Sequence, residues 1–152
     1  MLIIGIDPGA SGAIAVVDGI YPPQWYKLDC TEGDAKSFLR SHDLTDSFAY
    51  LERVHAMPKQ GVSSVFKFGQ SYGFLRGLLI GLGIPFEEVT PQKWQKAMGC
   101  LSKGDKNVTK AKAQQLFPGV KVTHAIADAL LIAEYGRRIR SGELRIESGE
   151  VK

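Results

Sequence analysis

The sequence predicts an α/β domain in which a five-stranded mixed sheet is flanked by helices. Two observations lead to this fold class. Short apolar runs bounded by glycine, proline and aspartate open the chain, and segments with helical spacing alternate with further strands after them. The length of 152 residues, with 44% hydrophobic and 23% charged residues, is typical of one globular domain and excludes fibrous and disordered classes.

Five short segments fit β-strands. The apolar runs 2–6 and 13–17 are separated by Asp-Pro-Gly and a further glycine, which predicts a β-hairpin at the start of the chain. We expect the remaining strands over 25–28, 48–51 and 85–89.

Five segments fit helices. Proline at position 91 suits the first turn of one of them, and Thr123 can cap the last. We expect helices over 34–40, 63–82, 91–98, 107–116 and 124–140. The domain is therefore expected to cover 1–140, followed by a polar tail over 141–152.

The helix expected over 63–82 carries a row of glycines spaced four residues apart: Gly69, Gly73, Gly77 and Gly81. Such a row lies along one helix face, and each helical glycine costs about 1 kcal/mol relative to alanine. The row therefore predicts close packing of another backbone on that face. We favour packing on the protein's own sheet, with a dimer interface as the alternative.

The net charge of +3 is unevenly distributed. Residues 53–112 contain ten Lys or Arg and three acids, a net of +7, so the remaining residues sum to −4. A central basic block is typical of proteins that bind a phosphate backbone, and equally of a basic surface that maintains solubility.

Cysteine and hydropathy patterns indicate the compartment. Cys30 and Cys100 have no CxxC spacing, and no signal peptide is recognisable, so we expect free buried thiols in a reducing cytoplasm. The apolar stretch 72–86 is interrupted by Arg76 and is shorter than the ~20 residues that span a bilayer. We expect no membrane role.

Asp7 ends a run, Leu-Ile-Ile-Gly-Ile, that has no polar alternation and therefore fits a strand buried on both faces. An ionised carboxylate in that position requires a cation, a basic partner or solvent. The alternative is that Asp7 only begins the Asp-Pro-Gly turn.

Glu52 repeats this arrangement at the end of the apolar run 48–51. Its structural alternative is an ion pair with Arg53 or a nearby lysine. Because ligands of open α/β sheets gather at the carboxyl ends of strands, we expect Glu52 and Asp7 to face one another.

Asp128 lies within the expected final helix, in a segment apolar almost all round, which predicts a buried helix. His124 precedes it by four residues and so projects from the same helix face. A histidine near a helix start is commonly structural, but imidazole and carboxylate together form a candidate pair of metal ligands.

Three carboxylates that converged without a cation would repel one another strongly. Mg²⁺ or Mn²⁺ would relieve this, and two such ions can activate water and stabilise the leaving oxygen of a phosphodiester without a nucleophilic side chain. The sequence contains no Walker loop, no Gly-x-Ser-x-Gly elbow and no Cys-His spacing suited to zinc. These residues therefore favour metal-dependent hydrolysis of a phosphodiester.

Four motifs in order resemble the RuvC-type Holliday junction resolvases, particularly the shorter phage-like members. They are Gly5-Ile6-Asp7-Pro8-Gly9, Leu51-Glu52-Arg53-Val54, Phe66-Lys67-Phe68-Gly69-Gln70-Ser71-Tyr72-Gly73 and Ala127-Asp128-Ala129-Leu130. The resemblance spans residue 2 to about 140. It implies a ribonuclease H-like fold, a homodimer, two metal ions per active site, and paired symmetric nicks in four-way DNA junctions during recombination and repair, in a bacterium or a phage host.

The resemblance also implies roles for individual residues. Asp7 would bridge both metals, Glu52 would bind one of them, and Asp128 would be the carboxylate of the final helix. The family usually has a fourth carboxylate three residues before the last one. That position is Ala125 here, so we expect His124 to replace it as a catalytic metal ligand.

The family also inserts an aromatic residue into the junction just after the glutamate. The matching position is His55 here, so Phe66, Phe68 or no wedge at all remain alternatives. Lysines in the basic block are the expected DNA-backbone contacts, and ordinary surface lysine is the alternative for each. These lysines are Lys67, Lys103, Lys106, Lys110 and Lys112.

Three other functions compete with junction resolution. The same nuclease fold could act on other branched DNA or on RNA, or the chain could be a nucleic-acid-binding module that lost its chemistry. The presence of Asp7, Glu52 and Asp128 argues against the non-catalytic binding module. A sugar or acetate kinase of the actin-like group also begins with Gly-Ile-Asp-x-Gly, but 152 residues leave no room for its second lobe.

Overall fold

A computed structural model describes residues 1–55 and 59–146. One sheet lies at its centre, with strand order β3-β2-β1-β4-β5. β1 pairs antiparallel with β2, β2 pairs antiparallel with β3, and β4 and β5 run parallel to β1. The predicted five-stranded mixed sheet is confirmed. The strands are β1 (Leu2–Asp7), β2 (Ala13–Val17), β3 (Gln24–Lys27), β4 (Ser47–Glu52) and β5 (Phe86–Val89).

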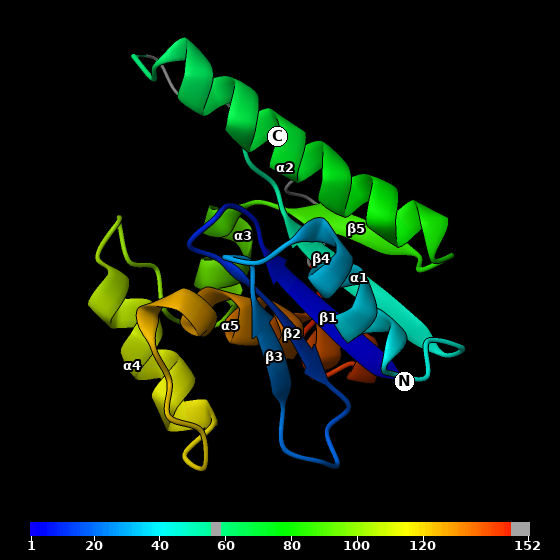
Figure 1. Ribbon diagram of the computed structural model, residues 1–152. Coiled ribbons are helices and arrows are strands. Elements are labelled where there is room, and N and C mark those ends of the chain that lie inside the picture. The colour runs from blue at the N-terminus through cyan, green and yellow to red at the C-terminus, as the bar shows by residue number, and fades with distance from the viewer. Residues whose placement is uncertain (56–58, 147–152) are drawn as a thin grey trace.

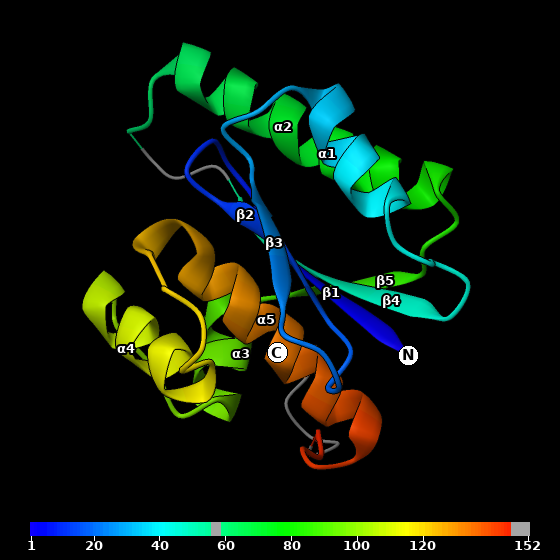
Figure 2. The same cartoon turned by 60° about the horizontal axis from the view of Figure 1, so that its bottom comes forward.

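Helices cover both faces of the sheet (Figures 1 and 2). α1 (Glu32–Arg40) and α2 (Val62–Gly81) lie on one face. The other face is covered by α5 (His124–Ser141), with α3 (Pro91–Ala97) and α4 (Lys106–Leu116) beside it. Each face buries its own hydrophobic cluster against the sheet.

Local signals set the helix ends. Thr31 Oγ1 accepts a hydrogen bond from the Asp34 backbone N–H, and the Asp34 carboxylate accepts one from the Thr31 N–H, each at 3.1 Å. This capping box starts α1 at Glu32, two residues earlier than predicted. α5 begins at His124 as predicted, although the Thr123 side chain makes no cap hydrogen bond, and Gly142 ends it with φ 80°. The predicted tail is described only as far as residue 146.

The alternation of side chains along β1 and β4 decides which way the strand-end acids point. Ile6 and Leu51 are register partners, and both belong to the cluster beneath α1 and α2. Asp7 and Glu52 follow them directly. Because successive side chains point to opposite faces, both carboxylates lie on the face covered by α5.

α5 lies directly against β1 and β4. A Cβ atom on Gly5 would overlap the backbone of Ala129 and Ala133, and one on Gly136 would overlap the ring of Tyr50. Glycine therefore permits contact between the helix and the sheet at both points. Every residue from 126 to 136 is buried, which confirms the predicted buried helix.

The glycine row of α2 does not pack on the protein's own sheet, so that expectation is wrong. A methyl group placed on Gly69, Gly73, Gly77 or Gly81 would meet no atom within 4 Å, and all four are exposed. The periodicity correctly predicted a shared face, but that face points away from the core.

Both cysteines are free, as expected, although only Cys100 is fully buried and Cys30 is half-buried. None of the helices within the described residues combines the length and the apolar character that crossing a bilayer requires.

Replacing Gly5 with alanine tests the contact between α5 and β1. Because the added methyl group would overlap helix backbone, we expect Gly5→Ala to lower the free energy of unfolding by about 1–3 kcal/mol or more. Gly33→Ala in α1 is the matched control, because its nearest neighbour would lie at an ordinary 3.7 Å. Chemical denaturation measures both variants. Unchanged stability of Gly5→Ala would contradict this packing.

Candidate active site

Asp7 and Glu52 lie side by side at the carboxyl edge of the sheet. They are the last residues of the parallel neighbours β1 and β4, one position beyond the paired residues Ile6 and Leu51. Glu52 is buried and Asp7 is half-buried. The structure thus places these two acids at neighbouring strand ends.

Asp128 approaches the same point from α5. It immediately precedes Ala129, whose carbonyl oxygen lies where a side chain on Gly5 would be. The Asp128 side chain is only 8% exposed. Its negative charge and that of Glu52 both raise the pKa of Asp7, so the three acids lie within electrostatic reach of one another.

Burial is the largest cause of the unusual protonation of this cluster. Desolvation, followed by the charges of Glu52 and Asp128, raises the pKa of Asp7 to about 8. Burial and the charge of Asp128 also raise the pKa of Glu52 to about 7, against opposing effects from Trp94 and Lys106. Near neutral pH these acids therefore hold protons unless a cation compensates them.

Lys106, the first residue of α4, supplies positive charge to the cluster. Its Nζ atom lies 3.4 Å from Asp128 Oδ2. Burial lowers the pKa of Lys106, but the charges of Asp128, Asp7 and Glu52 outweigh this and raise it. Lys106, one of the lysines expected to contact the DNA backbone, thus lies at the acids, and its DNA contact stays a prediction.

Trp94 is a site residue that was not predicted from the sequence. Its ring is fully buried on α3, and its Nε1–H donates a 2.7 Å hydrogen bond to Glu52 Oε2. A buried indole requires an acceptor, so this bond satisfies Trp94 and fixes one carboxylate oxygen of Glu52. The available signal was a tryptophan within the short, otherwise polar segment Pro-Gln-Lys-Trp-Gln-Lys-Ala.

The cluster suits a hard divalent cation in donor type and in charge. Its carboxylate oxygens are preferred ligands of Mg²⁺ and Mn²⁺, and Asp128 Oδ1 is buried without a hydrogen-bond partner. Within 1–55 and 59–146, however, no three His, Cys, Asp or Glu side chains are grouped as one metal-binding shell. Donor chemistry and the unpartnered oxygen thus favour a cation, while the acids are not arranged around one.

A cleft of about 510 Å³ opens beside Glu52 and Asp128. α3 and the loop that leads into α4 form its far wall, and Lys103 and Lys106 line it. Lys103 adopts a left-handed conformation, with φ 49°. Positive side chains therefore border the approach to the acids.

The other predicted site residues lie in different places. His124 is exposed. Its role as a metal ligand stays a prediction. Lys110 and Lys112 are half-buried on α4.

The candidate wedge residues differ in exposure. The Phe66 side chain on α2 is 70% exposed, whereas the Phe68 ring is half-buried and lies over Gly9 in the turn after β1. His55 is exposed, and the residues 56–58 that follow it lie outside the described part of the chain.

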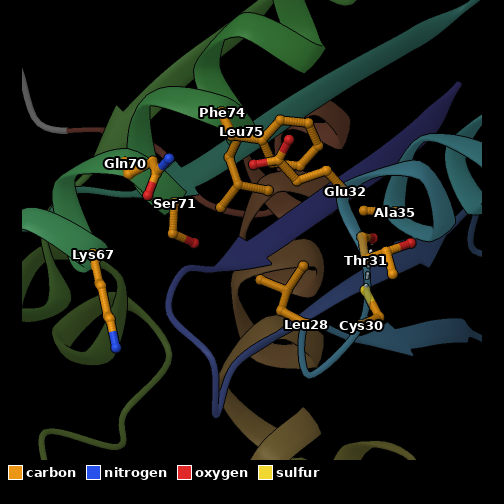
Figure 3. A pocket seen from close by; sticks show the side chains of 10 residues that line it. All are labelled: Leu28, Cys30, Thr31, Glu32, Ala35, Lys67, Gln70, Ser71, Phe74 and Leu75. Carbon is orange, nitrogen blue, oxygen red and sulfur yellow. Dashed lines mark hydrogen bonds between the residues drawn. The ribbon is translucent and has the colours of Figure 1, made fainter.

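Lys67 lines a second hollow, of about 240 Å³, between α2 and the start of α1. Figure 3 shows Lys67, Gln70 and Ser71 on α2 across this hollow from Cys30 and Thr31. The cluster packed beneath α1 and α2 forms its floor, so the hollow lies on the opposite sheet face from the acids.

The pKa of Asp7 predicts how the stability of the metal-free protein depends on pH. Because folding raises this pKa from 3.8 to about 8, the folded state binds more protons, and stability falls as pH rises between these values. We expect Asp7→Asn in EDTA to raise Tm by about 5 °C at pH 8, with a smaller gain at pH 5.

Asp34→Asn is the control of opposite sign, because hydrogen bonds from Thr31 lower the pKa of Asp34. We expect this variant to lose stability at pH 8. Thermal unfolding followed by circular dichroism measures both variants. A Tm of Asp7→Asn at pH 8 equal to or below that of the wild type would contradict the burial of an uncompensated carboxylate.

Comparison with known proteins finds one relative in sequence and several in fold. No family model matches the chain. Over 94 residues, 58% of its length, the chain is 31% identical to the Holliday junction resolvase MOC1, chloroplastic, of Chlamydomonas reinhardtii. The chain spans only 11% of the length of that relative.

Solved structures resemble the chain over nearly its whole length. Thermus thermophilus RuvC matches with a TM-score of 0.59 and 17% identity, covering 93% of this chain and 97% of RuvC. RuvC of the same organism in complex with a Holliday junction substrate matches with a TM-score of 0.63 and 16% identity, at the same coverage. The chain therefore has the ribonuclease H-like fold of RuvC, and its predicted resemblance to the RuvC-type resolvases is confirmed.

Proposed function

We propose that the chain is a metal-dependent endonuclease that resolves Holliday junctions by paired symmetric nicks. The convergence of Asp7, Glu52 and Asp128 at one edge of a RuvC-like sheet carries this proposal. The relative named a Holliday junction resolvase and the RuvC structure determined with junction DNA support the choice of substrate.

The three carboxylates would hold Mg²⁺ or Mn²⁺, two ions per site, with His124 as a proposed further ligand. When bound, such ions activate water and stabilise the leaving oxygen of a phosphodiester. Trp94 fixes one oxygen of Glu52 by its 2.7 Å hydrogen bond and so limits the orientations that the carboxylate can adopt. Lys106 lies close enough to Asp128 to place positive charge beside the phosphate being cut.

Basic side chains around the cleft would guide the DNA. Lys103 and Lys106 line the approach to the acids, and α4 also carries Lys110 and Lys112. Lys67 would contact a strand on the α2 side of the sheet. We propose that these lysines contact phosphates, which makes junction affinity fall as salt concentration rises.

Cleavage of defined DNA substrates tests this function. The wild type is incubated with a four-way junction, a linear duplex and an RNA–DNA hybrid, in Mg²⁺ or Mn²⁺ and in EDTA. We expect symmetric nicks confined to the junction and dependent on metal. Asp7→Asn should slow cleavage at least about 100-fold while fluorescence anisotropy shows retained junction binding.

Asp18→Asn is the matched control, because Asp18 lies in the β2–β3 turn, at the opposite end of β2 from Asp7. Equal cutting of the duplex would exclude a resolvase. Junction binding without cleavage in either metal would instead favour a non-catalytic binding module. Retained cleavage by Asp7→Asn would remove Asp7 from the mechanism.

We further propose that the chain acts as a homodimer whose two copies meet through α2. Paired nicks require two nuclease centres. The outer face of α2 carries a stripe of large apolar and small residues, and such a face is normally covered by protein. The stripe consists of Val62, Phe66, Gly69, Gly73, Gly77 and Ile80. Its large members are highly exposed: Val62 88%, Phe66 70% and Ile80 66%.

This α2 stripe is symmetric about Gly73. Gly69 and Gly77 lie four residues to either side of it, and Phe66 and Ile80 lie seven residues to either side. Two antiparallel copies that cross at Gly73 would place glycine against glycine, and Phe66 of each copy against the partner's Ile80. A two-fold interface requires this self-complementarity.

The substitution Gly73→Leu distinguishes a dimer from a monomer, because it should stabilise a monomer and disrupt the proposed dimer. In a monomer, leucine in open space should stabilise the helix by about 1 kcal/mol. In the proposed dimer, it should block backbone contact and yield a monomer that no longer makes paired nicks. Ser64→Leu is the matched control, since nine residues place it on the opposite side of α2. Sedimentation velocity reads the mass, and a monomeric wild type would exclude this interface.

A further inference from the structure

The cleft beside the acids has one wall whose chemistry differs from phosphate binding. α3 contributes Pro91, Gln92 and Gln95 to this wall, and the loop before α4 contributes Leu101 and Ser102. Lys103 and Lys106 line the cleft as well. Cationic side chains alone would suffice to bind a phosphate backbone. The neutral amide and apolar side chains of this wall therefore need a separate explanation.

The side-chain amide of Gln95 has a fixed orientation. Its Oε1 accepts hydrogen bonds from the backbone N–H and from the hydroxyl of Ser102, each at 3.3 Å. A backbone N–H can only donate, so the oxygen must face Ser102 and the amide nitrogen must face elsewhere. Among the residues that the structure describes, no group accepts a hydrogen bond from that nitrogen.

The surroundings of Gln95 hold it in place. Its backbone carbonyl accepts a 2.9 Å hydrogen bond from the Cys100 N–H, and the Ser102 hydroxyl accepts one from the Gly104 N–H at 3.3 Å. Gly99 and Gly104, with φ of 66° and 92°, allow the loop to fold back on α3. The free N–H₂ of Gln95 is thus a preorganised donor in the cleft.

An apolar side chain lies next to this donor. Leu101 lines the cleft and is 52% exposed, so it does not pack in the core. A flat nucleobase can contact an apolar side chain and an amide together, whereas a phosphate gains nothing from leucine. The pairing of Leu101 with Gln95 therefore fits a base, and the nearby lysines fit the phosphates on either side of it.

We propose that Gln95 is a specificity-determining residue, which donates from its amide nitrogen to an acceptor on the base that flanks the cleaved phosphate. This inference rests on the proposed nuclease function. Guanine, adenine and thymine each present an acceptor on the major-groove edge, whereas cytosine presents a donor there. Cytosine is accordingly the disfavoured base at one position beside the nick.

A junction pool with randomised base pairs on each side of the crossover tests this. Sequencing the products of wild-type cleavage in Mg²⁺ should show a depletion of cytosine of about fivefold at one flanking position. Gln95→Glu retains an oxygen for Ser102 but replaces the donor by an acceptor, so its preference should turn toward cytosine.

Gln92→Glu is the matched control, because it adds the same charge to the same cleft one helical turn away. It should keep the wild-type preference. Equal cutting at all four bases by the wild type would overturn the proposal, as would the same change of preference in both variants. Gln95→Met, which lacks donors and acceptors of comparable strength, should show no preference at that position.

Failure of the proposed function is distinguishable in the same samples. If the wild type cuts no junction, the nuclease assignment fails, and the bound fraction of the same pool is sequenced instead. Depletion of cytosine beside the crossover in that fraction would still support Gln95 as a reader of the base. A bound fraction with unchanged composition would overturn it.

Discussion

The contact between α5 and β1 at Gly5 is the constraint on which the site depends. Helix backbone occupies the space in which any side chain at position 5 would lie. Asp7 stands two residues after Gly5, and Asp128 stands next to Ala129 at the contact. One packing interaction therefore sets both the position of the last helix and the separation of two candidate metal ligands. A small shift of α5 would move Asp128 relative to the sheet edge.

The cluster created by this contact is poorly compensated in charge. Burial and mutual repulsion raise the pKa values of Asp7 and Glu52 to about 8 and about 7, and an oxygen of Asp128 has no hydrogen-bond partner. Lys106 and Trp94 offset only part of this cost. Unfavourable local electrostatics of this kind are typical of functional sites, where a bound ligand supplies the compensating charge that the protein lacks.

Much of this site could be predicted because its signals are local. Asp7 and Glu52 each end an apolar strand, and parallel pairing makes two such ends neighbours. Asp128 was recognisable as a charge in an otherwise apolar helix. Trp94 was not recognisable, because its hydrogen-bond partner Glu52 lies 42 residues away in the chain. The spacing of residues in a sequence does not show which elements become neighbours in the fold.

One feature, the packing of a glycine row, was misjudged for the same physical reason. The glycine row of α2 defines a helix face, but spacing does not tell whether that face points inward or outward. The DNA-backbone contact of Lys106 stays a prediction, and spacing alone could not show that tertiary packing also brings Lys106 to Asp128. His124 has the right spacing from Asp128 and stays a predicted ligand, but spacing could not show that it is exposed, before the continuous burial of α5 that begins at Ile126.

Binding of Mn²⁺ to the protein without DNA tests the convergence of the three acids most directly. Titration followed by electron paramagnetic resonance should show saturable binding to the wild type at pH 8 and strong loss of binding in both Asp7→Asn and Asp128→Asn. His124→Ala shows in the same titration whether the histidine is a ligand. Wild-type protein that binds no Mn²⁺, or an Asp128→Asn variant that binds it as tightly as the wild type, would contradict a shared metal centre.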